Sequence, residues 1–197
     1  MCDNTSGLVV VFLRGKRAVA SKLDISNAKP FDDGVPVDPE DRAPGELRGD
    51  FDLTRDLGSL YANTECGIFG VLSQENRPEA VGEAIPVARR TEVRTGKAVI
   101  LANCRGNEVC AYEIEIEKLY GGSAPTRNLL LRVTDPALIA LTGGIVQGMS
   151  GSPIVQDGKL VGAVTHVLLD DPQRGYGILA ENMLSASGMT AQSAASA

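Results

Sequence analysis

Ser150 lies in the run GMSGSP at residues 148–153, where glycines flank a serine that could act as a nucleophile. Acyl transfer requires backbone N–H groups that point at one spot beside the attacking oxygen. Gly148 and Gly151 allow the unusual backbone dihedrals that such a loop needs. Ser152 is the weaker candidate nucleophile because it lies closer to the strand that follows. The alternative is an ordinary Gly/Ser turn that leads into a hairpin.

A serine nucleophile normally needs a histidine base, and His166 is the only histidine in the sequence. It follows Thr165 in an apolar segment that is typical of a strand. Neighbouring side chains of a strand point to opposite faces, so Thr165 and His166 cannot both face the serine unless a bulge intervenes. We therefore expect His166 to be partly buried or to line a cleft, with the bulged alternative, His166 as the base, left open.

A short helix is predicted over residues 136–141, directly before the serine loop. Asp135 occupies the N-cap position, and Pro136 suits the first position of a helix. Gly143 or Gly144 can end the helix. The loop is therefore expected to connect this helix to the next strand.

A hairpin is predicted over residues 152–169, and the Asp157-Gly158 pair favours a type I′ turn at its tip. The segment 112–117 alternates strictly between apolar and acidic residues, so one face of that strand should contact water. Short strands at this spacing favour a sandwich or barrel over a parallel sheet. The other predicted strands cover residues 8–13, 17–23, 66–72, 97–102, 109–119 and 128–133.

The predicted domain covers residues 1–184 and contains a long loop rich in Pro, Gly and acidic residues at about 27–50. A Ser/Ala-rich flexible tail is expected at 185–197. Hydrophobic residues make up 43% of the chain and charged residues 22%, as in globular proteins. The net charge of −6 argues against nucleic acid as a partner. From the sequence we expect no membrane-spanning segment and no signal peptide in this chain.

The four cysteines form no CxxC pair, so we expect no metal site, and nothing in the sequence implies a cofactor. Cys104 and Cys110 could face each other across a hairpin and form a disulfide in an oxidising compartment. The alternative is that both remain thiols, which the ordinary burial of cysteine favours.

The residues around the serine resemble those of the SpoIVB-type sporulation serine peptidases. The resemblance rests on residues 143–154, 158–167, 171–172 and 175–177, and upstream on 66–70, 84–88 and 134–136, with a looser match at 44–47. It implies a mainly β fold, a chymotrypsin-like double β-barrel with one or two short helices, and leaves open that the first barrel is incomplete. In a chymotrypsin-like turn, the N–H groups of Gly148 and Ser150 would converge as an oxyanion hole.

The resemblance also implies a serine endopeptidase that cleaves a protein substrate through an acyl-enzyme in a sporulation signalling cascade. Such enzymes act outside the cytoplasm, in the space between the forespore membranes. Their substrate is a membrane-associated regulatory protein, and they also cleave themselves. Family members normally carry an N-terminal membrane anchor and a PDZ domain, and we expect this chain to lack both.

By resemblance, Ser150 is the nucleophile, Asp135 its acidic partner, and Thr165 and Gly151 supporting residues. The family's base lies in an upstream Gly-His motif, whose last three residues align loosely with residues 1–3, so we expect its histidine to be missing here. Loss of a triad histidine can cost about 10⁶-fold in kcat. The chain is then either a fragment of a longer enzyme or an inactive pseudo-peptidase that binds peptides. A purely structural β domain is the remaining alternative.

Overall fold

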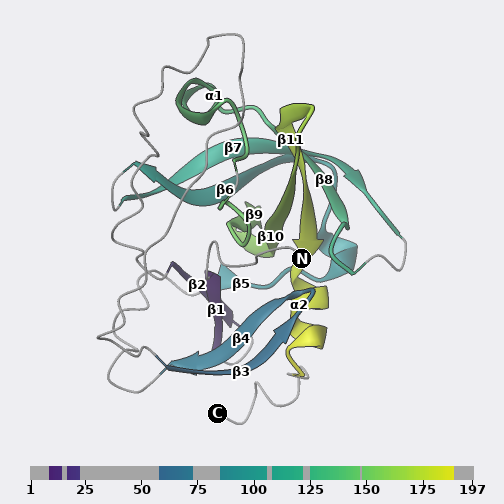
Figure 1. The fold of residues 1–197 in the computed structure, drawn as a ribbon. Helices are drawn as coiled ribbons and strands as arrows, with labels where there is room; N and C mark the ends of the chain where they lie inside the picture. Colours follow the sequence, from purple (N-terminus) through teal and green to yellow (C-terminus); the bar gives the residue numbers. More distant parts are fainter. Residues whose placement is uncertain are drawn as a thin grey trace.

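The structure is a computed structural model that describes residues 9–14, 17–22, 58–72, 85–105, 108–121, 125–146 and 148–188. Strands dominate this part of the chain, and its two α-helices are short (Figure 1). The strands are β1 (Val9–Arg14), β2 (Arg17–Lys22), β3 (Gly58–Thr64), β4 (Gly67–Leu72), β5 (Ile85–Pro86), β6 (Gly96–Arg105), β7 (Glu108–Leu119), β8 (Leu129–Val133), β9 (Pro153–Gln156), β10 (Lys159–Leu168) and β11 (Asp171–Leu179). The helices are α1 (Pro136–Thr142), α2 (Ala180–Ala186) and the 3-10 turn η2 (Arg90–Glu92).

Six strands close into a barrel in the order β10-β11-β8-β7-β6-β9, and every neighbouring pair is antiparallel. Its interior is aliphatic, as expected for a chain without tryptophan. Burial of such side chains is the main stabilising contribution to a barrel of this size. The largest fully buried side chains are Ile100, Ile114, Ile116, Leu129, Leu131, Leu138, Ile145, Met149, Ile154 and Ile178. The predicted mainly β, barrel-type architecture is confirmed.

The predicted strands at 97–102 and 109–119 correspond to β6 and β7, which pair with each other and place Val99 opposite Glu113. Along β7 the side chains of Ile114 and Ile116 are buried while Glu113 and Glu115 are exposed, as the alternating pattern predicted. The wet face of this strand is the outer surface of the barrel.

The type I′ turn between β9 and β10 is also confirmed. Asp157 has φ 51° and Gly158 has φ 75°, which are the two positive φ values that this turn requires. The pair of strands that it connects continues the hairpin up to Ala163 opposite Pro153. Beyond that point β10 has no β9 neighbour, and the serine loop lies beside it instead.

The N-terminal strands form two further small sheets, β1-β2-β5 and β3-β4, which lie on one side of the barrel in Figure 1. Val87, directly after β5, makes a parallel bridge to Leu160 of β10, and the Ala88 N–H donates to the Leu160 carbonyl at 2.9 Å. In the part of the chain that the structure describes, only one barrel is closed. Whether the N-terminal strands complete a further barrel stays a prediction.

Helix α1 confirms the predicted helix, and Gly143 ends it in the left-handed conformation with φ 75°. Helix α2 was not predicted, and it packs against β10 and β11. It continues to Ala186, past residue 184, where we expected the tail to begin. The remaining tail residues and the loop at 27–50 lie outside the described residues. Cys104 and Cys110 are partly buried thiols that pack against the barrel core.

Candidate active site

The serine loop starts where α1 ends, and it is fixed there by a close contact with β11. The Ile145 N–H donates to the Pro172 carbonyl at 2.7 Å. Gly144 has φ 142°, and a Cβ at this position would collide with the same carbonyl oxygen. The loop therefore needs glycine here to approach β11 this closely.

Met149 anchors the middle of the loop in the core, with only 1% of its side chain exposed. Its N–H donates to the Val146 carbonyl at 3.2 Å, and its own carbonyl accepts from the Ser152 N–H at 3.0 Å. Two successive tight turns therefore place Ser150 on the outside, where its side chain is exposed. Burial of Met149 therefore leaves the next residue, Ser150, exposed to solvent.

Next to the serine, the loop forms backbone hydrogen bonds with β10 just beyond the last residue of β10 that pairs with β9. The Gly151 N–H donates to the Val164 carbonyl at 2.7 Å, and the Val164 N–H donates to the Ser152 carbonyl at 2.9 Å. The Ser150 hydroxyl continues this row and donates to the Thr165 carbonyl at 2.9 Å. Ser150 is therefore held beside the part of β10 that has no strand partner on this side among the described residues.

The loop has spare backbone donors beside the serine. Gly148 and Gly151 have φ 93° and 91°, which a side chain would disfavour. Within the described residues, neither the Gly148 N–H nor the Ser150 N–H donates a hydrogen bond. Two unpaired donors flanking Met149 are what an oxyanion hole requires. Their convergence on one point remains a prediction.

Thr165 meets the nucleophile through its backbone and not through its side chain. The Thr165 hydroxyl lies within hydrogen-bond distance of the Thr126 carbonyl (3.0 Å) and the Tyr176 carbonyl (3.1 Å). The register of β10 and β11 shifts between Val164 and His166, so a β-bulge occurs at Thr165. The regular alternation that we assumed for this segment is therefore wrong at this residue.

His166 is exposed and lies opposite Tyr176 in the register of β10 and β11. Its surroundings lower the pKa of the imidazole, first by partial burial of the ring and then by the charge of Arg127. The Ser150 hydroxyl bonds to the Thr165 carbonyl and not to this ring. The bulge removes the geometric objection to His166, and its role as base stays a prediction.

Asp135 caps α1, as the sequence predicted. One carboxylate oxygen accepts from the N–H groups of Ala137 (2.8 Å) and Leu138 (3.1 Å), and the other accepts from the Glu113 N–H at 3.1 Å. Partial burial opposes the charged form, but these three bonds outweigh it and hold the pKa of the carboxyl below its usual range. Both oxygens are therefore occupied by backbone donors. The role of Asp135 as the partner of a catalytic base stays a prediction.

Four residues next to the site were missed from the sequence, and we call them the cation–aromatic strip: Lys118, Tyr120, Arg127 and Tyr176. The guanidinium carbon of Arg127 lies 5.3 Å from the ring centroid of Tyr176. The ring centroids of Tyr176 and Tyr120 are 6.2 Å apart. The Lys118 ammonium lies over the ring of Tyr120, 4.9 Å from its centroid. The only signal in the sequence was Tyr176, an aromatic residue between two glycines.

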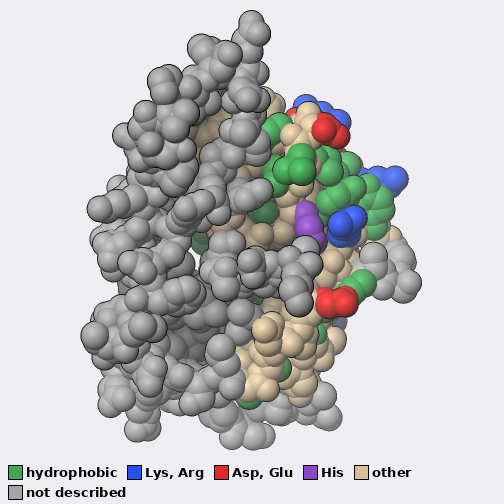
Figure 2. Space-filling view, viewed as in Figure 1, with side chains coloured by type: hydrophobic (Ala, Val, Ile, Leu, Met, Phe, Trp, Pro, Cys, Tyr) green, Lys and Arg blue, Asp and Glu red, His purple; other side chains and the backbone are tan. Residues whose placement is uncertain are grey.

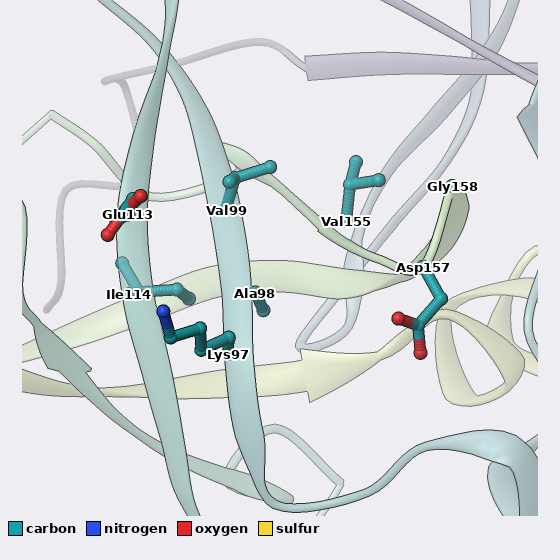
Figure 3. A pocket seen from close by; sticks show the side chains of 8 residues that line it. All are labelled: Lys97, Ala98, Val99, Glu113, Ile114, Val155, Asp157 and Gly158. Carbon is teal, nitrogen blue, oxygen red and sulfur yellow. The ribbon is translucent and has the colours of Figure 1, made fainter.

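A hollow of about 320 Å³ lies elsewhere, on the outer side of β6, β7 and β9 (Figure 3). Its walls include Val99 and Val155, with Glu113 and Asp157 at its borders. None of the predicted site residues lines it. It is therefore separate from the candidate active site.

An exposed serine on a glycine-flanked loop beside a closed antiparallel barrel is the arrangement expected of a serine peptidase. The comparison with known families agrees: the family described as SpoIVB peptidase S55 matches residues 36–184. The chain belongs to this family of serine peptidases.

Two solved structures of the Rv3671c protease are similar to this chain. The inactive form has a TM-score of 0.39 at 22% identity and covers 52% of this chain and 54% of its own. The active form, from M. tuberculosis, has a TM-score of 0.37 at 25% identity, and the match covers 53% of this chain and 49% of that one. The match thus spans about half the length of each of those chains. No curated protein matches the chain.

Proposed function

We propose that this chain is a serine endopeptidase domain in which Ser150 is the nucleophile. The observation that carries this proposal is the loop itself, in which Ser150 is exposed and the N–H groups of Gly148 and Ser150 have no acceptor among the described residues. Family membership supports the same reaction class.

In the proposed reaction, the Ser150 oxygen attacks a peptide carbonyl, and the hydroxyl proton moves to a base. The N–H groups of Gly148 and Ser150 stabilise the negative oxygen of the tetrahedral intermediate. Collapse of the intermediate breaks the C–N bond, and the proton passes from the base to the leaving amine. Water then attacks the acyl-enzyme by the same sequence and releases the acid and the free serine.

The substrate is proposed to lie in extended form along β10. Val164 is bonded to the serine loop, and from Thr165 onward β10 has no strand on its β9 side among the described residues. Ser150 lies at the start of this open edge. An extended peptide can add to such an edge through backbone hydrogen bonds. It would displace the Ser150 hydroxyl from the Thr165 carbonyl, and so release the nucleophile for attack.

The proposed reaction also requires a base that takes the proton of the Ser150 hydroxyl. A carbonyl oxygen such as that of Thr165 cannot take the serine proton, so the hydrogen bond seen here is a resting arrangement. The base is either His166 after rotation or a group outside the described residues. Asp135 would then orient the base only if one of its oxygens leaves a backbone donor.

Resemblance to the family supports the cellular setting that we propose. The enzyme would act outside the cytoplasm, in the forespore intermembrane space, on a membrane-associated regulatory protein and on itself. In the part of the chain that the structure describes, no helix is both long and apolar enough to cross a membrane.

A second candidate function is peptide binding without cleavage. It is favoured by the bond from the Ser150 hydroxyl to a carbonyl, because no base contacts the nucleophile among the described residues. The same open edge of β10 would hold the peptide.

One experiment separates the two functions. The chain and its Ser150→Ala variant are incubated with a peptide library, and new termini are read by mass spectrometry. Cleavage by the unchanged chain alone supports the peptidase. Equal cleavage by both proteins would overturn the role of Ser150, and retention of peptides by both without cleavage would favour the binding function.

A further inference from the structure

The cation–aromatic strip is connected to the nucleophile by a short series of contacts. The Ser150 hydroxyl donates to the Thr165 carbonyl, and the Thr165 hydroxyl lies 3.0 Å from the Thr126 carbonyl. The next residue along the chain is Arg127, whose guanidinium lies over the ring of Tyr176. Arg127 also lies near His166 of β10, since its charge contributes to the lowered pKa of that histidine. A side chain of a peptide bound along β10 that lies on the same face as His166 and Tyr176 would therefore point towards Arg127.

The guanidinium carbon of Arg127 lies over the ring of Tyr176, a cation–π contact that favours this position of the side chain. A guanidinium that stacks on an aromatic face keeps its N–H groups free at the edges of the plane, where they can form two parallel bonds to a carboxylate. Tyr176 is itself supported by Tyr120, and Lys118 caps that second ring. The strip thus holds two cations on a row of two rings.

The charge of the strip is not neutralised within the described residues. The ion pairs found there join Glu117 to two arginines and pair Asp157 and Glu92 with other cations. Neither Lys118 nor Arg127 takes part in one. Arg127 nevertheless acts on its surroundings, since its charge contributes to the lowered pKa of His166.

This local positive charge occurs on a chain whose net charge is −6. Figure 2 shows the histidine on the described surface with basic and hydrophobic side chains beside it. A carboxylate of a bound peptide would supply the charge that the strip lacks.

We propose that Arg127 is a specificity-determining residue that selects an acidic side chain in a peptide held on β10 beside Ser150. The inference rests on the proposed function, because it assumes that an extended peptide occupies the open edge. Arg127 acts on the choice of substrate and takes no part in the transfer of protons.

The test uses the Ser150→Ala variant of the full chain, so that bound peptides remain intact. Three fluorescent pools of eight-residue peptides carry one fixed Glu, Gln or Lys in a neutral background, and binding is read by fluorescence polarisation. We expect the Glu pool to bind about fivefold more tightly than the Gln pool, the effect of one partly screened ion pair. Arg127→Gln should remove this preference, and Arg127→Glu should shift it to the Lys pool.

Arg94→Gln is the matched control, because it removes one positive charge from an exposed ion pair with Asp157, at the far end of β9 from the serine loop. It should leave the preference for Glu unchanged. Equal binding of the Glu and Gln pools, or a preference that survives in Arg127→Gln, would overturn the inference and leave the peptidase proposal standing. Failure of all three pools to bind would overturn both the inference and the extended binding mode, while labelling of Ser150 by an acylating probe would still test the nucleophile separately.

Discussion

Replacing Asp135 by alanine removes the acceptor of three backbone hydrogen bonds, from the N–H groups of Ala137, Leu138 and Glu113. Loss of a helix N-cap costs about 1 kcal/mol, and the Glu113 N–H loses a further charge-assisted bond at about the same cost. We expect a total loss of about 2 kcal/mol, which for a domain of this length lowers Tm by about 4–8 °C. Asp135→Asn keeps an oxygen for the helix but no acceptor for Glu113, so it should lose about 1 kcal/mol.

Calorimetry or urea unfolding of the three proteins across pH measures these differences. The carboxyl pKa of Asp135 is lowered in the folded protein. Its contribution to stability is therefore present above the unfolded-state pKa and is lost as the pH falls through the folded-state pKa. The difference in the free energy of unfolding between the wild type and Asp135→Ala should therefore become smaller in acid. A difference below about 0.5 kcal/mol at neutral pH, or a gap that pH leaves unchanged, would refute the capping argument.

Three further predictions concern the barrel and its charges. Gly162→Ala should prevent folding or strongly lower Tm, because its Cβ would collide with a carbonyl of β11, whereas Gly121→Ala, which meets no atom, should melt as the wild type does. Glu117→Gln should destabilise the protein by about 1 kcal/mol at neutral pH and not in acid, because hydrogen bonds from Arg174 and Arg132 lower the pKa of the Glu117 carboxyl. Melting curves of both proteins at the two pH values measure this difference. An NMR titration should place the pKa of His166 below the ordinary histidine range, and Arg127→Gln should raise it; an unchanged value would contradict the proximity of the two side chains.

The elements around the nucleophile could be predicted because their signals are local. The Asp-Gly pair specifies its turn through two positive φ values, and Asp135 specifies the start of α1 through its side-chain oxygen. Helix α2 has no such signal, since its N-cap, Leu179, provides no side-chain acceptor. It forms because Ala180 is buried and the helix packs against β10 and β11.

The details of the site depend on contacts between residues far apart in the sequence. A bulge at Thr165 arises from the register of β10 and β11, which no local pattern of this segment encodes. The bond of the Ser150 hydroxyl to the Thr165 carbonyl likewise depends on how the loop meets the edge of β10. Arg127 gave no signal in the sequence, because an isolated surface arginine acquires significance only from the ring that it covers.

The most direct test of the central claim is the reaction of the folded chain with a fluorophosphonate, read by intact mass and peptide mapping. Ser150→Ala is the negative control, and Ser152→Ala, which changes the neighbouring hydroxyl, is the matched one. We predict a single adduct at Ser150 that persists in Ser152→Ala and disappears in Ser150→Ala. A folded chain that forms no adduct at Ser150, or one that is labelled equally in Ser150→Ala, would contradict the assignment of Ser150 as an activated nucleophile.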